Sequence, residues 1–220
     1  VDLTEPEAQP EQLHPRFDQR VFTAQERGQI AASAEPHRTR WMLWASKEST
    51  YKAAYKISSA VRFIPVQFAT NLDPCGTGTV RYKDDDYAVV VIHSKRWIHA
   101  VTVYGVHGAS GSSPISGVME YAPDRFRISL NRAEKGYVYA AVQPIGNAPD
   151  GSGSSVSRNL VRQTMGEILA LNPKKLEVIK TGKAPQLALE HRVIEADLSL
   201  SHHGLFVAFA CFVEGLDQPF

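Results

Sequence analysis

The stretch from Pro36 to Tyr55 constrains the fold most, because it is long and has no internal glycine or proline. It is rich in Ala, Lys, Glu and Trp, a composition typical of a helix. Upstream of it, Thr23 is followed three residues later by Glu26, which is the spacing of a capping box. This spacing predicts a shorter helix from about 24 to 32. The N-terminal part of the chain is therefore expected to contain two consecutive helices.

The pattern of residue types changes between Val61 and Gln143, where short β-branched and aromatic runs alternate with Gly, Pro, Asp and Ser. This alternation predicts antiparallel strands. The segment 146–156 is rich in Gly and Ser and predicts a linker. A helix at about 157–171 and strands at LEVIKT, VIEADLSLS and FVAFACFVE are expected after it. We therefore expect an α+β protein with a first lobe at 1–145 and a second lobe at 157–220.

The charge balance and the cysteine content argue against several classes of protein. Lys and Arg number 24 against 23 Asp and Glu, a formal net charge of +1, which argues against a dedicated nucleic-acid binder. Two distant cysteines do not form a disulfide framework or a zinc cluster, and they indicate a cytoplasmic protein. No apolar run has the length of a membrane span. The chain begins with Val1 rather than Met, so we expect a processed or excised piece of a longer protein.

Three side chains of the longer predicted helix recur every four residues: Trp44, Glu48 and Lys52. They lie on one helix face, and two interpretations remain open. The first is a surface ion pair beside a core tryptophan. The second is half of a phosphate site, in which the carboxylate holds Mg²⁺ and the ammonium neutralises a phosphoryl oxygen.

Two distant stretches bear on this choice. Asp2 lies between Val1 and Leu3, an unusual place for a carboxylate unless it faces a site or a metal. In SLSHHG, Ser201 and His202 stand at a predicted strand end just before a glycine, where the backbone can approach a ligand closely.

Taken together, VDLT, W-x-x-KES-x-x-K and SLSH resemble the 4'-phosphopantetheinyl transferases, which move phosphopantetheine from coenzyme A to a serine of an acyl or peptidyl carrier protein. The resemblance implies that Asp2 and Glu48 hold Mg²⁺. It also implies that Lys52 meets the pyrophosphate and that His202, with Ser201 beside it, meets the coenzyme A phosphates.

Other stretches extend the resemblance. RFDQRVFTAQER and EKGYVYAAVQP are similar to family segments. LEVIKTGKAPQL resembles a strand and turn that cradle the adenine, which would involve Gly182, Lys183 and Pro185. SRNLVRQTMGEIL resembles a helix whose arginine reaches a coenzyme A phosphate, here Arg158.

The motif order matches the small holo-acyl-carrier-protein synthases, whereas the length matches the larger, two-lobed surfactin-type enzymes. The resemblance thus implies two pseudo-symmetric lobes, each an antiparallel sheet packed with helices, with coenzyme A in the cleft between them. A monomeric two-lobed unit and a domain of a larger synthase, such as a polyketide synthase, both fit. We expect no membrane and no nucleic-acid partner. Four arginines are candidates for docking an acidic carrier or are ordinary solvated side chains: Arg16, Arg20, Arg38 and Arg40.

Thr4 stands where related sequences often carry a third acidic ligand, so the third ligand stays open. The general base is also open, and our hypothesis is Glu48 acting through a water on the metal. The alternative function is a non-catalytic module of a larger synthase that docks a carrier or binds coenzyme A.

Overall fold

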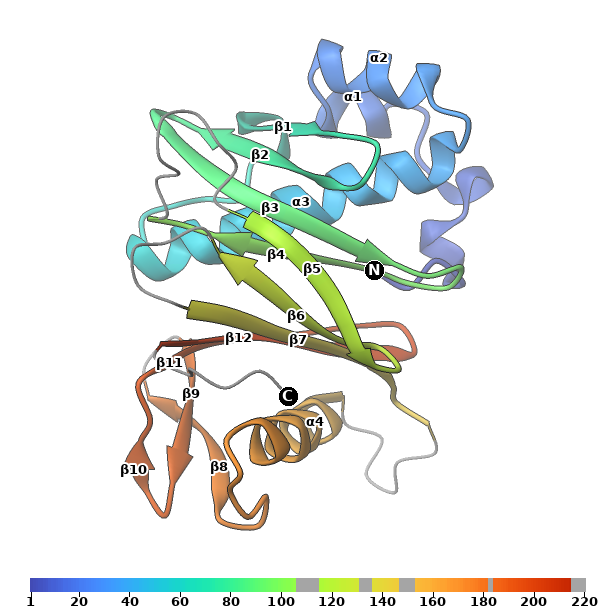
Figure 1. Cartoon of the computed structure of the whole chain (residues 1–220). Helices are drawn as coiled ribbons and strands as arrows, with labels where there is room; N and C mark the ends of the chain where they lie inside the picture. The colour runs from blue at the N-terminus through green and yellow to red at the C-terminus, as the bar shows by residue number, and fades with distance from the viewer. Residues whose placement is uncertain (106–114, 131–135, 147–152, 182–183, 215–220) are drawn as a thin grey trace. The chain divides into compact units, whose positions relative to one another are not determined.

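The computed structural model describes residues 1–105, 115–130, 136–146, 153–181 and 184–214. The chain divides into two compact units, Val1–Ile115 and Ser116–Phe220. Helices and antiparallel sheets occur in both units, so the predicted α+β class is confirmed (Figure 1). None of the helices in the described ranges is long and apolar enough to cross a membrane.

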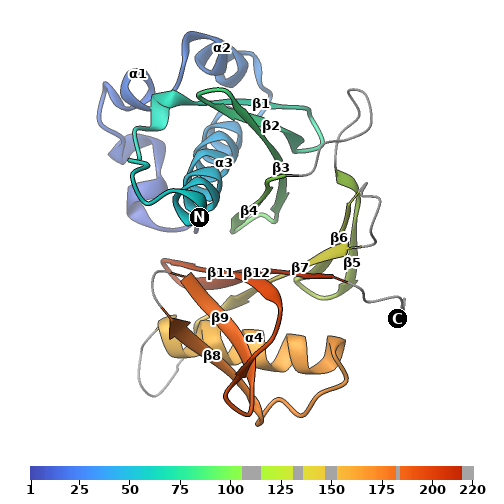
Figure 2. The same ribbon diagram turned by 90° about the vertical axis from the view of Figure 1, so that its left-hand side faces the viewer.

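The first unit pairs one long helix with a four-stranded antiparallel sheet in the order β1-β2-β3-β4. In Figure 2 this sheet curves around the long helix α3, which is seen nearly end-on. The helical elements are η1 (Pro6–Ala8), η2 (Pro10–Gln12), α1 (Phe17–Val21), α2 (Ala24–Ala32), α3 (Pro36–Ile57) and η3 (Pro65–Gln67). The strands are β1 (Phe68–Leu72), β2 (Thr77–Tyr82), β3 (Asp85–His93) and β4 (Ile98–Val103).

Both predicted helices of this unit form where the sequence signals place them. The capping box of α2 is complete: the Thr23 side chain accepts from the Glu26 amide, and the Glu26 side chain accepts from the Thr23 amide. Pro36 is the first residue of α3, a position where its missing N–H has no cost. The strand expected in VRFIPVQFA is wrong in its first part, because Pro65 starts a 3₁₀ turn and β1 begins only at Phe68.

The first three residues of the chain attach to the start of β4. Val1 and Ile98 exchange backbone hydrogen bonds, Asp2 forms an isolated antiparallel bridge with Trp97, and the Leu3 amide donates to the Arg96 carbonyl. The N-terminal segment is thereby held at a fixed register beside the sheet.

The second unit contains a five-stranded antiparallel sheet, a three-stranded sheet and helix α4. The strand orders are β11-β12-β7-β6-β5 and β10-β9-β8, and α4 packs on the larger sheet through Leu160, Val161 and Met165 (Figure 2). The elements are β5 (Ile115–Ala122), β6 (Arg125–Leu130), β7 (Gly136–Pro144), α4 (Gly153–Ile168), β8 (Leu176–Thr181), β9 (Ala184–Leu189), β10 (Arg192–Val193), β11 (Ala196–His203) and β12 (Phe206–Glu214).

The boundary between the units differs from the expected linker at 146–156. β7 pairs with β12 from Gly136↔Glu214 to Pro144↔Phe206, so β5, β6 and β7 belong to the second unit and not to a first lobe of 1–145. Of the expected linker, 147–152 lies outside the described residues. The part from Gly153 onward is the first turn of α4, so this helix begins earlier than its apolar spacing indicated.

Candidate functional site

The Glu48–Lys52 pair lies on the exposed side of α3. The Lys52 Nζ is 3.0 Å from the Glu48 Oε1, and the two side chains are 36% and 39% exposed. An exposed pair at this spacing contributes only about 0.3–0.5 kcal/mol to stability. Both groups can therefore exchange their mutual contact for a ligand at little cost.

Asp2 is fully buried, unlike Glu48. Its Oδ1 accepts two hydrogen bonds from Thr4, one from the backbone amide at 2.8 Å and one from the hydroxyl at 2.6 Å. These bonds compensate part of the cost of burying a carboxylate, and they fix the direction in which it points. Thr4, which raised the question of a third ligand, thus orients the Asp2 carboxylate that the sequence predicts as a ligand.

The pKa of one group, the amino group of Val1, is affected by all three predicted side chains of the first unit. Burial lowers the pKa of the Val1 amino group to about 6, while Glu48 raises this pKa, Lys52 lowers it and Asp2 raises it. Asp2, Glu48 and Lys52 therefore all lie within electrostatic reach of one buried atom. The two carboxylates favour a cation at this point, whereas the lysine opposes it.

A magnesium ion fits this donor set. Mg²⁺ is commonly bound through one or two carboxylates, with substrate phosphates and waters completing its shell. Asp2 and Glu48 supply two carboxylates of this kind. The described residues contain no group of three or more His, Cys, Asp or Glu side chains that could hold a metal, so a site built from protein ligands alone is not formed there.

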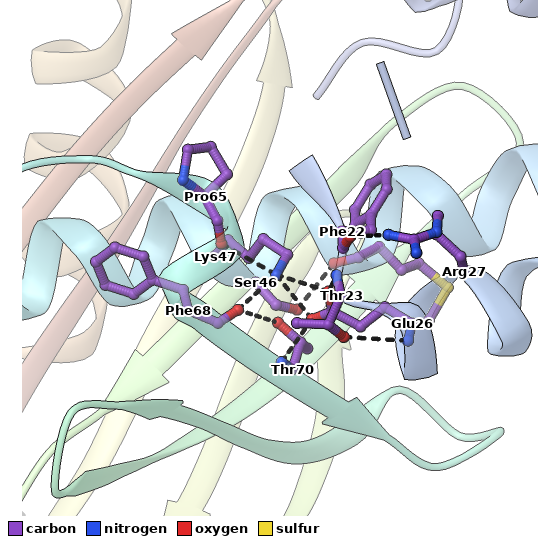
Figure 3. Close-up of polar contacts among 10 residues, drawn as sticks. Phe22, Thr23, Glu26, Arg27, Ser46, Lys47, Pro65, Phe68 and Thr70 are labelled. Carbon is purple, nitrogen blue, oxygen red and sulfur yellow. Dashed lines mark hydrogen bonds and ion pairs between the residues drawn. The ribbon is translucent and has the colours of Figure 1, made fainter. Parts of the chain in front are cut away.

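The sequence analysis missed a second ion pair on α3, between Lys47 and Glu26. The Lys47 Nζ donates to both Glu26 carboxylate oxygens at 2.7 and 2.9 Å, and to the carbonyls of Pro65 at 3.1 Å and Phe68 at 2.5 Å (Figure 3). The side chains of the lysine and the glutamate are 0% and 1% exposed. Burial lowers the pKa of Lys47, and the hydrogen bond and charge of Glu26 oppose this shift. The capping box located Glu26, but no local spacing pointed to its partner.

The remaining predicted residues belong to the second unit. His202 is exposed near the end of β11, and a Cβ added to Gly153 would lie 3.4 Å from its ring. The first residue of α4 thus packs directly against the imidazole. Ser201 points to the opposite face of β11, since neighbouring strand residues alternate, so the two side chains do not act from the same face.

Arg158 is exposed in the first half of α4. Pro185 pairs with Lys180 inside the β8–β9 hairpin and so belongs to a strand, where a turn was expected. Gly182 and Lys183 lie outside the described residues. The structure therefore gives positions to four of the six second-unit candidates.

Two of the four candidate docking arginines have carboxylate partners. Arg40 forms a bidentate pair with Asp18 at 2.8 and 2.9 Å, which joins α3 to α1. Arg38 pairs with Glu35 at 2.5 Å. Both are thereby less suited to recognise an acidic partner than a fully solvated arginine.

Comparison with protein-family models matches residues 1–102 to the 4'-phosphopantetheinyl transferase superfamily. No curated protein and no solved structure matches the chain. The matched segment runs from the N-terminal residues almost to the end of β4, and it contains Asp2, Glu48 and Lys52. Residues 1–102, just under half of the chain, are therefore similar to the 4'-phosphopantetheinyl transferase superfamily.

Proposed function

We propose that the chain transfers 4'-phosphopantetheine from coenzyme A to a serine of an acyl or peptidyl carrier protein and releases 3',5'-ADP. The observation that carries the proposal is the family match over residues 1–102, which contains Asp2, Glu48 and Lys52. Two carboxylates beside one lysine are the charges that a metal-bound pyrophosphate requires.

The metal ligands in this proposal are Asp2 and Glu48, and Lys52 contacts a pyrophosphate oxygen. Mg²⁺, when bound, supplies positive charge that neutralises the pyrophosphate. Lys52 adds a second positive charge, and its weak pairing with Glu48 lets it turn to the phosphate. Thr4 keeps the Asp2 carboxylate oriented while the ligands change.

The transfer forms one bond and breaks one. The serine Oγ of the carrier attacks the β-phosphorus of coenzyme A, and the bond from this phosphorus to the bridging oxygen breaks. The electron pair leaves with 3',5'-ADP, and the serine proton passes to a base, for which we propose Glu48. Charge neutralisation by fixed groups supplies most of the acceleration expected for phosphoryl transfer.

The second unit, in this proposal, recognises coenzyme A. His202 and Arg158 carry the phosphate contacts, whereas Gly182, Lys183 and Pro185 contact the adenine. The packing of Gly153 against His202 supports the histidine assignment, because backbone amides at the start of a helix favour an anion.

Intact-mass analysis of an apo carrier protein tests the proposal. The carrier is incubated with the chain, coenzyme A and Mg²⁺, and we expect a gain of one phosphopantetheine that a chelator prevents. Glu48→Gln should abolish the gain while coenzyme A binding persists. Glu120→Gln, in β5 of the second unit, is the matched control and should leave the gain intact. Transfer by Glu48→Gln at the wild-type rate contradicts the assignment.

One observation favours a second candidate, a carrier-docking or coenzyme A-binding module without turnover. By the family resemblance, Thr4 stands at the place of a third acidic ligand, and its hydroxyl donates to the Asp2 carboxylate. The dependence of coenzyme A affinity on Mg²⁺ separates the candidates. A transferase should bind coenzyme A more tightly with Mg²⁺, whereas a docking module should show no such linkage.

A further inference from the structure

Lys47 occupies the centre of the most buried stripe of α3. Leu43, Lys47, Thr50 and Ala54 follow one another at helical spacing and are 0%, 0%, 0% and 2% exposed. Core positions in such a stripe are normally apolar. A lysine at the middle of this stripe therefore calls for a specific explanation.

The surroundings of Lys47 satisfy every polar group of the pair. Besides binding Lys47, the Glu26 carboxylate accepts from the Thr23 amide at 2.7 Å and from the Thr70 amide at 2.6 Å. Figure 3 shows these groups converging from α2, α3 and the chain entering β1. One lysine and one glutamate thus connect three segments by directional bonds.

Stability alone does not explain this arrangement. Removing two charges from water is costly, and apolar replacements of buried ion pairs are often neutral or stabilising. Directional bonds differ from apolar contacts in what they fix, because an apolar side chain tolerates small rotations of its helix whereas a buried hydrogen-bonded pair does not. The pair therefore specifies geometry.

The geometry that it specifies includes the exposed pair on the same helix. Successive helix residues are separated by about 100°, so Glu48 stands about 100° and Lys52 about 140° around α3 from Lys47. We infer that the buried Glu26–Lys47 pair is a positioning device that fixes the rotation of α3 and thereby aims Glu48 and Lys52. The inference rests on the proposed function, in which these two side chains hold metal and phosphate.

The test replaces the pair in the full chain by neutral residues of similar size, as E26Q/K47M. The glutamine retains an acceptor for the capping box. We expect the variant to fold cooperatively but to bind Mn²⁺, followed by electron paramagnetic resonance as a probe for Mg²⁺, about tenfold more weakly. The kcat for transfer should fall as well, with less change in the KM for coenzyme A. R81M/D86N removes an exposed ion pair of the same unit and should change neither quantity.

A second readout does not depend on function. Trp44 and Tyr51 of α3 contact Phe63, with ring centroids 5.5 and 5.0 Å apart, and Phe63 precedes the Pro65 carbonyl that Lys47 holds. Rotation of α3 should weaken the nuclear Overhauser effects between these rings in E26Q/K47M. If the double variant does not fold, the variant E26D, which keeps the carboxylate charge but shortens its reach to Lys47, provides the same readouts with smaller changes.

The outcomes separate the two claims. If the wild-type chain neither binds Mn²⁺ nor transfers phosphopantetheine, the proposed function fails, and weakened ring contacts in the variant still support a positioning role for the pair. If the wild-type chain is active and the folded variant keeps its Mn²⁺ affinity, kcat and ring contacts, the inference is overturned while the proposed function stands.

Discussion

The two lysine–glutamate pairs of α3 have the same chemistry and opposite environments. Lys47 and Glu26 are 0% and 1% exposed, and backbone groups occupy the rest of their hydrogen-bonding capacity. Lys52 and Glu48 are 36% and 39% exposed and meet at 3.0 Å. The first pair is a fixed part of the core, whereas the second is only weakly held together.

This difference shows why a site can be built beside a rigid core on the same helix. A ligand-binding charge must be able to change partners, and an exposed pair can do so at small cost. A helix that carries such charges must not move, and a buried pair resists motion because an unpaired buried charge is unfavourable. α3 contributes to both kinds of pair through Lys47 and Lys52, which are only five positions apart.

Lys47→Met should have the largest effect, because it breaks only one side of the buried pair. Glu26 is left buried without its cation, and we expect a loss of about 3–5 kcal/mol in the free energy of unfolding. All three tryptophans lie in the first unit, so urea unfolding followed by tryptophan fluorescence reports this unit. A loss similar to that of an exposed pair would show that Glu26 finds other partners.

Lys52→Met should have the opposite effect: a large loss of activity and a small loss of stability. We expect the rate of transfer to fall by about 100-fold, since a preorganised charge at the phosphate is lost. The free energy of unfolding should change by only about 0.3–0.5 kcal/mol. Intact-mass kinetics and urea unfolding measure the two quantities. Lys56→Met, one turn further along α3, removes an equal charge and should keep the wild-type rate.

Asp2 extends the comparison to a third carboxylate environment. It is as buried as Glu26, and its Oδ1 accepts hydrogen bonds from the amide and the hydroxyl of Thr4. Thr4→Val removes the hydroxyl donor and should weaken Mn²⁺ binding by about tenfold. Thr4→Ser retains the hydroxyl and should stay close to wild type. Equal affinities for the two variants would show that the Thr4 hydroxyl does not orient Asp2.

The smallest expected effect is the coupling between Glu48 and Lys52. A double-mutant cycle with Glu48→Gln and Lys52→Met should give about 0.3–0.5 kcal/mol of stability at low salt. Salt at about 1 M should remove it, because exposed charges are then screened within about 3 Å. The corresponding cycle for Glu26 and Lys47 should keep its coupling in the same salt. Persistence of the exposed coupling would contradict its description as a solvated pair.

Local signals in the sequence predicted local structure well. The capping box at Thr23 located the start of α2, and the four-residue spacing of Glu48 and Lys52 predicted a pair on one face of α3. The strands β8 and β12 match the predicted stretches LEVIKT and FVAFACFVE. These features depend on neighbours within a few residues, which the sequence displays directly.

Features that join distant segments could not be predicted in this way. The Glu26–Lys47 pair spans 21 positions, and nothing in either local pattern identifies the other residue. The boundary between the units lies earlier in the chain than expected, because β7 pairs with β12. In the sequence, α4 and the smaller sheet lie between these two strands. A Gly/Ser-rich stretch is typical of a linker, yet its last part starts α4 at Gly153.

The attachment of Asp2 to Trp97 has a consequence for the order in which the chain acquires its chemistry. The two residues meet only after the intervening helix and sheet have closed a loop, since the contacts from Val1 to Ile98 span 97 positions. Closing a loop of this length is entropically costly until the enclosed structure exists. During synthesis, α3 with Glu48 can form early, whereas the carboxylate of Asp2 reaches its place only once β4 has left the ribosome. In the proposed function, a partly made chain would therefore lack one of its two metal ligands.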